Sequence, residues 1–375
     1  MIYKNAYIFT EDGTFVHGWF SVKEGLFEHI GQGFCEMEGI DLEGSKVIPG
    51  LIDVHGHGNS GYDFSTCDLE GLKVMTRYLA ANGVTTVTPA SMTMPIEALE
   101  RAYANALALH KERDGARVAG INMEGPYFSY GKRGAQHPDY LKKPDFEEFK
   151  RLYDGCEGLI KIACVAPELE GAMDFIERAK ELCTVSIAHT ECTYDIAREA
   201  IAKGATQLTH LFNGMPSLHH RDPGPIAAGA EKKQVYAELI CDGIHVHPSV
   251  IRMAFKMFPG RIILISDSLA GCGMGDGEYD LGGQKVFING PRATLENGTI
   301  AGSVSNLFQM MRNAIKFGIP EKYAITAATI NPAGQIGMDE QLGSIRVGKI
   351  ADFVVCDDEL NIKEVFVEGN PIEES

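Results

Sequence analysis

The chain has 375 residues, which is too long for one small module and suits one large domain with an accessory part. Hydrophobic residues make up 45% of it and charged residues 23%, so a full-sized core is available and global disorder is excluded. Lys and Arg number 34 against 51 Asp and Glu, and the resulting formal charge of −17 argues against non-specific binding to nucleic acids or anionic membranes.

Cysteine usage and hydropathy indicate where the protein acts. Nine cysteines occur without a C-x-x-C pair, in a chain too large to need disulfide staples, which favours a reducing compartment. The opening residues MIYKNAYIFTEDGTF alternate like a strand and lack the layout of a signal peptide. No apolar run reaches the roughly 18 residues of a membrane span. We expect a soluble cytoplasmic protein with no nucleic-acid or membrane partner.

The two ends of the chain share a strand-rich pattern. Residues 1–46 read as short strands separated by turns, and residues 342–375 read as two or three strands with a turn at Asp357-Asp358. These ends flank a middle of different character. We therefore predict one small β-sandwich domain built from residues 1–46 and 342–375.

The middle of the chain alternates apolar, β-branched runs with segments of helical spacing. The eight predicted strands are Val47–Val54, Val84–Thr88, Val118–Met123, Ile160–Ala166, Thr184–Ala188, Gln207–Thr209, Tyr236–Cys241 and Ile262–Ser266. The predicted helices are Leu69–Ala81, Ile96–Glu112, Phe146–Tyr153, Ala172–Leu182, Tyr194–Lys203 and Ser249–Phe258, with extra helices over Val304–Phe317 and Glu321–Ile330. The interval after the sixth strand is expected to be mostly loop.

This alternation predicts an α/β fold, a (β/α)₈ TIM-type barrel over residues 47–341 that includes the extra helices at its C-terminal end. A doubly wound open sheet is the competing topology. It is disfavoured because no glycine-rich dinucleotide turn follows any of the predicted strands.

Residues able to do chemistry stand at the C-terminal ends of these strands, the rim on which a (β/α)₈ barrel builds its active site. They are His55, His57, Glu124, His189, His210, His245 and Asp267. His and carboxylate ligands that converge from different strands suit Zn²⁺ or Fe²⁺, with one position open for water. A His-Gly-His motif alone, or a single rim histidine alone, is compatible with an ordinary polar residue. Together they predict a divalent metal site.

Asp267 closes the eighth predicted strand, where it is either a helix N-cap or a catalytic base. The residues after it, 268–275, look like a flexible loop rather than a helix start. This favours the base, which would deprotonate water and return the proton to the leaving group.

The segment from His210 to Gly224 is the only dense cationic stretch near the rim. Asn213, a glycine amide and Arg221 can hold an anion, and His245 adds a donor on the same side. A solvated loop is the alternative interpretation. We expect a ligand that carries phosphate or carboxylate.

Taken together, these motifs resemble the amidohydrolase superfamily, and within it the N-acetylglucosamine-6-phosphate deacetylase family. The matching stretches are VIPGLIDVHGHG (47–58), INMEGPYFSYGKRGAQHP (121–138), IAHTECTY (187–194), LTHLFNGMPSLHHRDPG (208–224), ICDGIHVHP (240–248), ILISDSLAGCGMGDGEYDLGG (263–283) and LENGTIAGS (295–303). The resemblance covers essentially the whole length, including the split β domain.

The resemblance implies one or two divalent metals, Zn²⁺ or Fe²⁺, with Glu124, His189 and His210 as main ligands and His55 and His57 available for a second ion. It implies that Asp267 is the catalytic acid/base and that His245 helps to orient the substrate. The substrate contacts that it implies are Ala135, Gln136, His137, Asn213, Gly214, Arg221, His245, Ile300, Ala301 and Gly302. It also implies a homodimer in which Arg221 serves the neighbouring subunit's site.

The implied reaction is metal-dependent hydrolysis of the N-acetyl group of N-acetylglucosamine 6-phosphate to glucosamine 6-phosphate and acetate, in amino-sugar catabolism and recycling. The galacto epimer of this substrate is an open alternative. A cyclic-amide hydrolase is more remote, because such enzymes bridge two metals with a carboxylated Lys at the end of strand four, whereas Lys161 begins that strand here and Glu168 follows its end. A non-enzymatic barrel is opposed by the full set of ligands.

Overall fold

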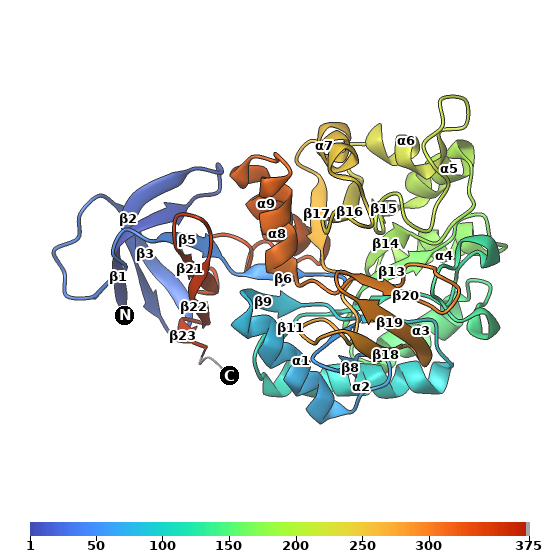
Figure 1. The fold of residues 1–375 in the computed structure, drawn as a ribbon, viewed down its shortest axis with the longest axis horizontal. Helices are drawn as coiled ribbons and strands as arrows, with labels where there is room; N and C mark the ends of the chain where they lie inside the picture. The colour runs from blue at the N-terminus through green and yellow to red at the C-terminus, as the bar shows by residue number, and fades with distance from the viewer. Residues whose placement is uncertain (373–375) are drawn as a thin grey trace.

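In the computed structural model, which describes residues 1–372, strands from both ends of the chain form one sheet and the middle of the chain forms a barrel (Figure 1). Residues 373–375, the last three of the predicted terminal segment, lie outside the described residues. Among residues 1–372, no helix is long and apolar enough to cross a membrane. The predicted α/β class, with a TIM-type barrel and a separate terminal β unit, is confirmed.

The terminal sheet has eight strands. They are β1 (Ile2–Phe9), β2 (Phe15–Lys23), β3 (Leu26–Gln32), β4 (Ile40–Asp41), β5 (Lys46–Pro49), β21 (Phe353–Cys356), β22 (Ile362–Val367) and β23 (Asn370–Pro371). Their order is β23-β22-β21-β5-β1-β2-β3, with β4 paired to β1. The predicted sandwich is thus one continuous sheet, and in Figure 1 it lies on the left, apart from the barrel.

Aromatic side chains from both chain ends fill the inner face of this sheet. Tyr3 stacks on Phe20 with ring centroids 5.1 Å apart, and Phe353 stacks on Phe366 at 4.3 Å. Phe20 also meets Phe353 edge-on at 5.0 Å. All four rings are buried, so the first and last segments of the chain share one core.

The strand predicted over Val47–Val54 is divided at Gly50, which corrects the sequence prediction. Its first half, β5, pairs with β1 and β21 in the terminal sheet, whereas its second half, β6 (Leu51–Asp53), pairs with β9 in the barrel. A Cβ atom at residue 50 would lie 2.2 Å from Thr85 Oγ1. Glycine therefore lets the chain pass closely over the barrel between the two sheets.

The barrel strands are all parallel. They are β6, β9 (Val84–Val87), β10 (Ala90–Ser91), β11 (Arg117–Val118), β12 (Ile121–Met123), β13 (Ile160–Val165), β14 (Thr184–Ile187), β15 (Ala205–Leu208), β16 (Tyr236–Ile240) and β17 (Ile262–Ile265). The third predicted strand is broken into β11 and β12, whereas the second matches β9 and is followed by the short β10, which was not predicted. The Asp267 N–H donates to the His55 carbonyl at 2.8 Å, which joins the end of the last strand to the end of the first.

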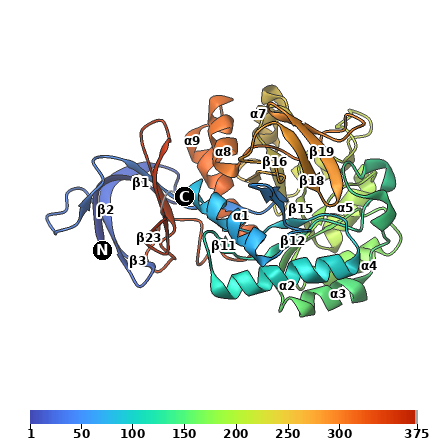
Figure 2. The same cartoon turned by 60° about the horizontal axis from the view of Figure 1, so that its bottom comes forward.

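Helices surround the barrel strands (Figures 1 and 2). They are α1 (Leu69–Ala81), α2 (Ile96–Glu112), α3 (Phe146–Gly155), α4 (Ala172–Ala179), α5 (Tyr194–Lys203), α6 (Gly224–Ala230), α7 (Pro248–Met257), α8 (Leu307–Lys316), α9 (Glu321–Ala328) and α10 (Ile330–Gln335). The helix α6 occupies the interval expected to be mostly loop. Its sequence GPIAAGA has too few large apolar residues to show a helical period.

A three-stranded hairpin sheet was not predicted from the sequence. It consists of β18 (Gly277–Leu281), β19 (Gln284–Asn289) and β20 (Arg292–Thr294), and Figure 2 shows β18 and β19 in orange over the upper part of the barrel, apart from the terminal sheet on the left. Most side chains of β18 are exposed, so the alternation that marks a half-buried strand is weak there.

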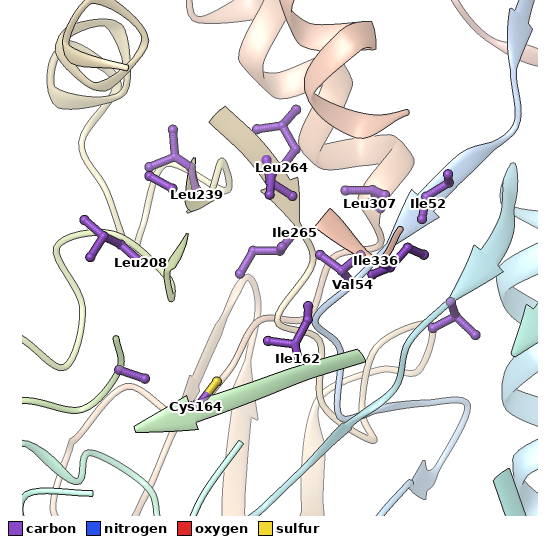
Figure 3. Close-up of a cluster of buried hydrophobic side chains, with 14 of the residues drawn as sticks. Ile52, Val54, Ile162, Cys164, Leu208, Leu239, Leu264, Ile265, Leu307 and Ile336 are labelled. Carbon is purple, nitrogen blue, oxygen red and sulfur yellow. The ribbon is translucent and has the colours of Figure 1, made fainter. Parts of the chain in front are cut away.

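The barrel core is aliphatic and joins strands to the extra helices. Figure 3 shows this contact, in which side chains from the strands meet others from α8 and from the segment after α10. The labelled residues are Ile52, Val54, Ile162, Cys164, Leu208, Leu239, Leu264, Ile265, Leu307 and Ile336. Their burial fixes the positions at which the strands end, and therefore the positions of the rim residues.

A buried ion pair connects the barrel to the terminal sheet. Arg117 Nη1 on β11 donates to Asp352 Oδ2 at 2.6 Å, and its Nη2 donates to Glu368 Oε1 at 2.7 Å. The Arg117 and Asp352 side chains are 6% and 4% exposed. Burial raises the pKa of Asp352, and the charge of Arg117 opposes that rise.

We expect Arg117→Met to lower the free energy of unfolding by about 3–5 kcal/mol, because the substitution leaves Asp352 buried without its cation. Denaturation by urea would measure the loss. Arg77→Met is the matched control, since Arg77 pairs with Asp114 at the exposed surface, where such pairs contribute about 0–1 kcal/mol. Equal small losses in both variants would contradict this interpretation of the ion pair.

Candidate active site and metal centre

The rim residues predicted from the sequence come together at one end of the barrel. Six of them follow barrel strands closely: His55 and His57 after β6, Glu124 after β12, His189 after β14, His210 after β15 and Asp267 after β17. Parallel strands all end on the same side of the barrel, so short extensions from them converge.

Glu124 lies at the centre of this cluster. The Nε2 atoms of His189 and His210 each lie 3.1 Å from Glu124 Oε1, and His55 Nε2 lies 3.5 Å from the same oxygen. His57 Nε2 lies 3.3 Å from the other oxygen, Oε2. All five side chains are buried. One carboxylate therefore faces four imidazole rings, and we call these five residues the His/Glu cluster.

The second nitrogen of each ring, Nδ1, contacts an acceptor that fixes the orientation of the ring. These acceptors are Glu238 Oε2 for His55 (2.9 Å), Ala90 O for His57 (3.0 Å), Lys132 O for His189 (2.8 Å) and Asn213 O for His210 (3.1 Å). Carbonyl and carboxylate oxygens only accept, so Nδ1 carries the proton in every ring. Each Nε2 therefore faces the carboxylate oxygens of the site, where it donates when the ring is protonated and offers its lone pair to a cation when the ring is neutral.

The packing of acids against bases shifts their pKa values. Burial alone would raise the pKa of Glu124, but the charge of His55 and hydrogen bonds from His189 and His210 hold it well below its usual range. Burial also disfavours the His55 cation, yet Glu238 and Glu124 raise the pKa of His55 well above its usual range. The cluster thus favours an ionised carboxylate next to positive charge.

The donor set fits a divalent metal ion. Glu124 forms one group of potential ligands with His55 and His57 and another with His189 and His210, and within each group the ligand atoms lie within 4.8 Å of one another. His55 Nε2 is buried without a hydrogen-bond partner, and the Nε2 atoms of His189 and His210 face each other at 3.1 Å. Two nitrogen lone pairs at that distance repel unless a proton or cation lies between them. Imidazole and carboxylate are ligands of Zn²⁺ and Fe²⁺.

Asp267 stands beside the cluster. Its Oδ1 lies 3.3 Å from His57 Nε2 and 3.8 Å from His55 Nε2. Burial opposes its ionisation, but the hydrogen bond from His57 and the charge of His55 lower the pKa of Asp267 to about 2. Its carbonyl accepts the Ser303 N–H at 2.7 Å. Asp267 is therefore an ionised carboxylate held in a fixed position.

Three non-glycine residues of the site have a left-handed backbone. The φ angles are 44° at His189, 27° at His210 and 46° at Asp267. Such conformations cost of order 1–3 kcal/mol each and are found where the surroundings hold them. Here the Ser129 N–H donates to the His189 carbonyl and the Asn213 N–H to the His210 carbonyl, both at 2.9 Å. The strained backbone turns the chain sharply where each strand ends, which aims these side chains into the rim.

A cavity of about 300 Å³ lies over the His/Glu cluster. The predicted site residues that line it are His57, Glu124, Ala135, Gln136, His189, His210, Asn213, Gly214, His245, Asp267, Ile300, Ala301 and Gly302. Gln136 Nε2 donates to Glu124 Oε2 at 2.7 Å, and Gln136 Oε1 accepts the Thr93 N–H at the same distance. Gln136 thus supports the cluster as well as lining the cavity.

His245 lines the cavity in a fixed orientation. Its Nδ1 lies 2.6 Å from Asp242 Oδ2, and Asp242 Oδ1 accepts the backbone N–H groups of Ile244 at 2.8 Å and His245 at 2.9 Å. Burial opposes ionisation of Asp242, but the hydrogen bond from His245 keeps the pKa of Asp242 below its usual range. These contacts leave His245 Nε2 for a ligand.

Two predicted substrate contacts, His137 and Arg221, do not line the cavity of this chain. The His137 ring stacks on Tyr140 with centroids 4.5 Å apart. Arg221 is exposed on the loop before α6, where its Nη1 lies 2.6 Å from His220 Nε2. The service of Arg221 to a neighbouring subunit stays a prediction.

Sequence reasoning missed several residues that support or line the site, among them Glu238, Asp242, Met92 and Leu281. Glu238 could have been found, because a charged residue within the buried strand YAELI demands a partner. Asp242 has the spacing of a local turn and gave no separate signal. Leu281 belongs to the unpredicted hairpin, and Met92 looks like an ordinary core residue.

We expect Glu238→Gln to weaken divalent-metal binding by about 10- to 100-fold, because the amide cannot accept from the His55 ring, the Gln207 side chain and the His210 N–H together. Competition with a chelator would measure the affinity for Zn²⁺. Glu364→Gln, at an exposed position of the terminal sheet, is the control. A folded Glu238→Gln protein with unchanged affinity would show that Glu238 does not support a metal ligand.

Comparison with known proteins gives one consistent result. The model of the amidohydrolase family matches residues 46–372. An N-acetylglucosamine-6-phosphate deacetylase of Vibrio furnissii is 33% identical, with 88% of this chain and 84% of that protein covered. An N-acetylgalactosamine-6-phosphate deacetylase of Escherichia coli O157:H7 is also 33% identical, with 88% of each chain covered.

A solved structure resembles the whole chain. It is that of a variant N-acetyl-D-glucosamine-6-phosphate deacetylase from Mycobacterium smegmatis in complex with N-acetyl-D-glucosamine-6-phosphate. It superposes with a TM-score of 0.94 at 31% identity, over 100% of this chain and 99% of that one. The chain therefore belongs to the amidohydrolase family, within the group of amino-sugar-phosphate deacetylases.

Proposed function

We propose that this protein hydrolyses the N-acetyl group of N-acetylglucosamine 6-phosphate, giving glucosamine 6-phosphate and acetate, in the cytoplasm as a step of amino-sugar catabolism and recycling. The observation that carries this proposal is a carboxylate, Asp267, held beside a buried His/Glu cluster on the floor of a cavity with polar donors at its edge. The relatives and the M. smegmatis complex support the substrate class.

The cavity offers a polar end suited to the sugar phosphate. Asn213, Gly214 and His245 line it beyond the His189 and His210 rings, and His245 Nε2 is available as a donor when the ring is protonated. Gly214 has φ 61°, and a Cβ there would lie 3.0 Å from His189 Nδ1, so a small residue keeps this backbone close to the site. We assign these three residues to orientation of the phosphorylated sugar.

Asp267 moves the proton. Water attacks the acetamide carbonyl carbon and gives a proton to Asp267, and the resulting tetrahedral species loses the sugar amine when Asp267 returns that proton to nitrogen. The C–N bond breaks, a C–O bond forms, and acetate and the amine leave. Burial opposes ionisation of Asp267, but the hydrogen bond from His57 and the charge of His55 lower its pKa, so the carboxylate is ionised and able to accept this proton.

A bound divalent metal would raise the acidity of the attacking water and polarise the carbonyl. Glu124, His189 and His210 would hold it, and His55 and His57 would hold a second ion that shares Glu124. We propose Zn²⁺ or Fe²⁺, because the ligand set is imidazole and carboxylate.

We also propose a homodimer in which Arg221 reaches the neighbouring subunit's phosphate. Arg221 is exposed, lies on the loop between β15 and α6, and does not enter the cavity of its own chain. A guanidinium is well matched to phosphate, and an acidic protein needs local positive charge to bind an anion.

Two enzymatic alternatives differ in what supports them. The galacto epimer would use the same residues and is kept as the second candidate because of the E. coli relative. A cyclic-amide hydrolase finds less support, because Lys161 lies near the start of β13 while Glu124 takes the shared position between the two ligand groups.

We expect acetate release from N-acetylglucosamine 6-phosphate by protein loaded with Zn²⁺ or Fe²⁺, at a higher kcat/KM than from N-acetylgalactosamine 6-phosphate. Asp267→Asn should lower kcat by about 10²- to 10⁴-fold with metal content unchanged, because the amide cannot accept or return the proton. Asp195→Asn, an exposed change on α5, is the control. Unchanged turnover in Asp267→Asn would remove its proposed role, and no acetate from either sugar by metal-loaded protein would refute the reaction.

A further inference from the structure

The cavity has an apolar end as well as a polar one. Met92, Leu281 and Ala301 line it, and all three are almost fully buried. They belong to a hydrophobic cluster of their own, separate from the barrel core, that includes the inner face of the hairpin β18–β20. We call Met92 and Leu281 the apolar wall.

The backbone around Met92 places this wall beside the His/Glu cluster. Two residues before it, the Ala90 carbonyl accepts from His57 Nδ1 at 3.0 Å. One residue after it, the Thr93 N–H donates to Gln136, which in turn donates to Glu124. Met92 therefore stands on the side of the cluster formed by His57 and Glu124 Oε2, whereas His189 and His210 contact the other oxygen, Oε1.

Packing and hydrogen bonds of the hairpin β18–β20 hold Leu281 in a fixed position. A Cβ at Gly282, the next residue, would lie 2.7 Å from Met92 Cβ, so the hairpin turn already packs tightly on Met92. The Gly282 N–H donates to Asp63 Oδ2 at 3.3 Å, and Gln284 Nε2 donates to the Ala135 carbonyl. These contacts tie the hairpin to the rim on both sides, so the apolar wall has little freedom to move outward.

We infer that Met92, together with Leu281, limits the size of the acyl group that the enzyme removes; this inference rests on the proposed function. When the acyl carbonyl carbon lies over the His/Glu cluster and the sugar phosphate lies at the polar end, the alkyl part of the acyl group points to the apolar wall. A methyl group fits against Met92 and Leu281. Each additional methylene must displace side chains that the hairpin holds, so Met92 is a specificity-determining residue.

The test compares N-acetyl-, N-propionyl- and N-butyryl-glucosamine 6-phosphate as substrates of the wild type, Met92→Ala and Met94→Ala. One methylene in an apolar pocket typically changes kcat/KM by about 10- to 200-fold. We expect Met92→Ala to raise the butyryl-to-acetyl ratio of kcat/KM by at least about tenfold. Met94→Ala is the matched control, because Met94 packs on the same hydrophobic cluster and near Gly282 but does not line the cavity.

Leu281→Ala, on the hairpin side of the wall, gives a second variant that should shift the ratio in the same direction. Binding of the butyryl compound to Asp267→Asn and to Met92→Ala/Asp267→Asn, measured by calorimetry, reports the same selectivity without turnover. If the wild type releases acetate but Met92→Ala and Leu281→Ala keep its acyl preference in both assays, this inference is wrong while the proposed function stands. A metal-loaded wild type that binds the sugar phosphates but releases no acid would instead overturn the proposed function.

Discussion

The structure depends above all on one buried carboxylate. Glu124 meets four imidazole rings at 3.1–3.5 Å, and its ionised form is stabilised only because those rings surround it. Like the rings, it is buried, so the charges must compensate one another or be joined by a metal. The four rings come from three strand ends of the rim, and each ring needs its own acceptor behind it. The barrel interior supplies one of these acceptors through Glu238.

The remainder of the fold holds that cluster in place. The strained backbone at His189, His210 and Asp267 persists because neighbouring loops bond to their carbonyl groups, and the Asp267 N–H closes the barrel onto His55. The hairpin β18–β20 packs behind the apolar end of the cavity, whereas Asn213 and Gly214 of the loop before α6 line its polar end. We thus propose that substrate binding, proton transfer and acyl selection use three different sides of the His/Glu cluster.

The alternation of apolar runs with segments of helical spacing was sufficient to predict the barrel, because buried parallel strands are strongly apolar. The rim could be predicted because polar residues such as Glu124 and Asp267 follow those strands. Where the signal is weak, the sequence did not suffice. Gly50 gave no sign that one apolar run serves two sheets, and Leu281 lies in a hairpin whose first strand is mostly exposed. Glu238 acts through His55, a contact between distant segments that no local pattern reveals.

The most direct test of this account is anomalous X-ray scattering at the zinc edge from crystals of the Zn²⁺-loaded protein. The account predicts a peak within bonding distance of Glu124, His189 and His210, and a second beside His55 and His57 that also contacts Glu124. Zinc bound elsewhere on the chain, with no peak at Glu124, would contradict the claim that this carboxylate is the centre of the active site.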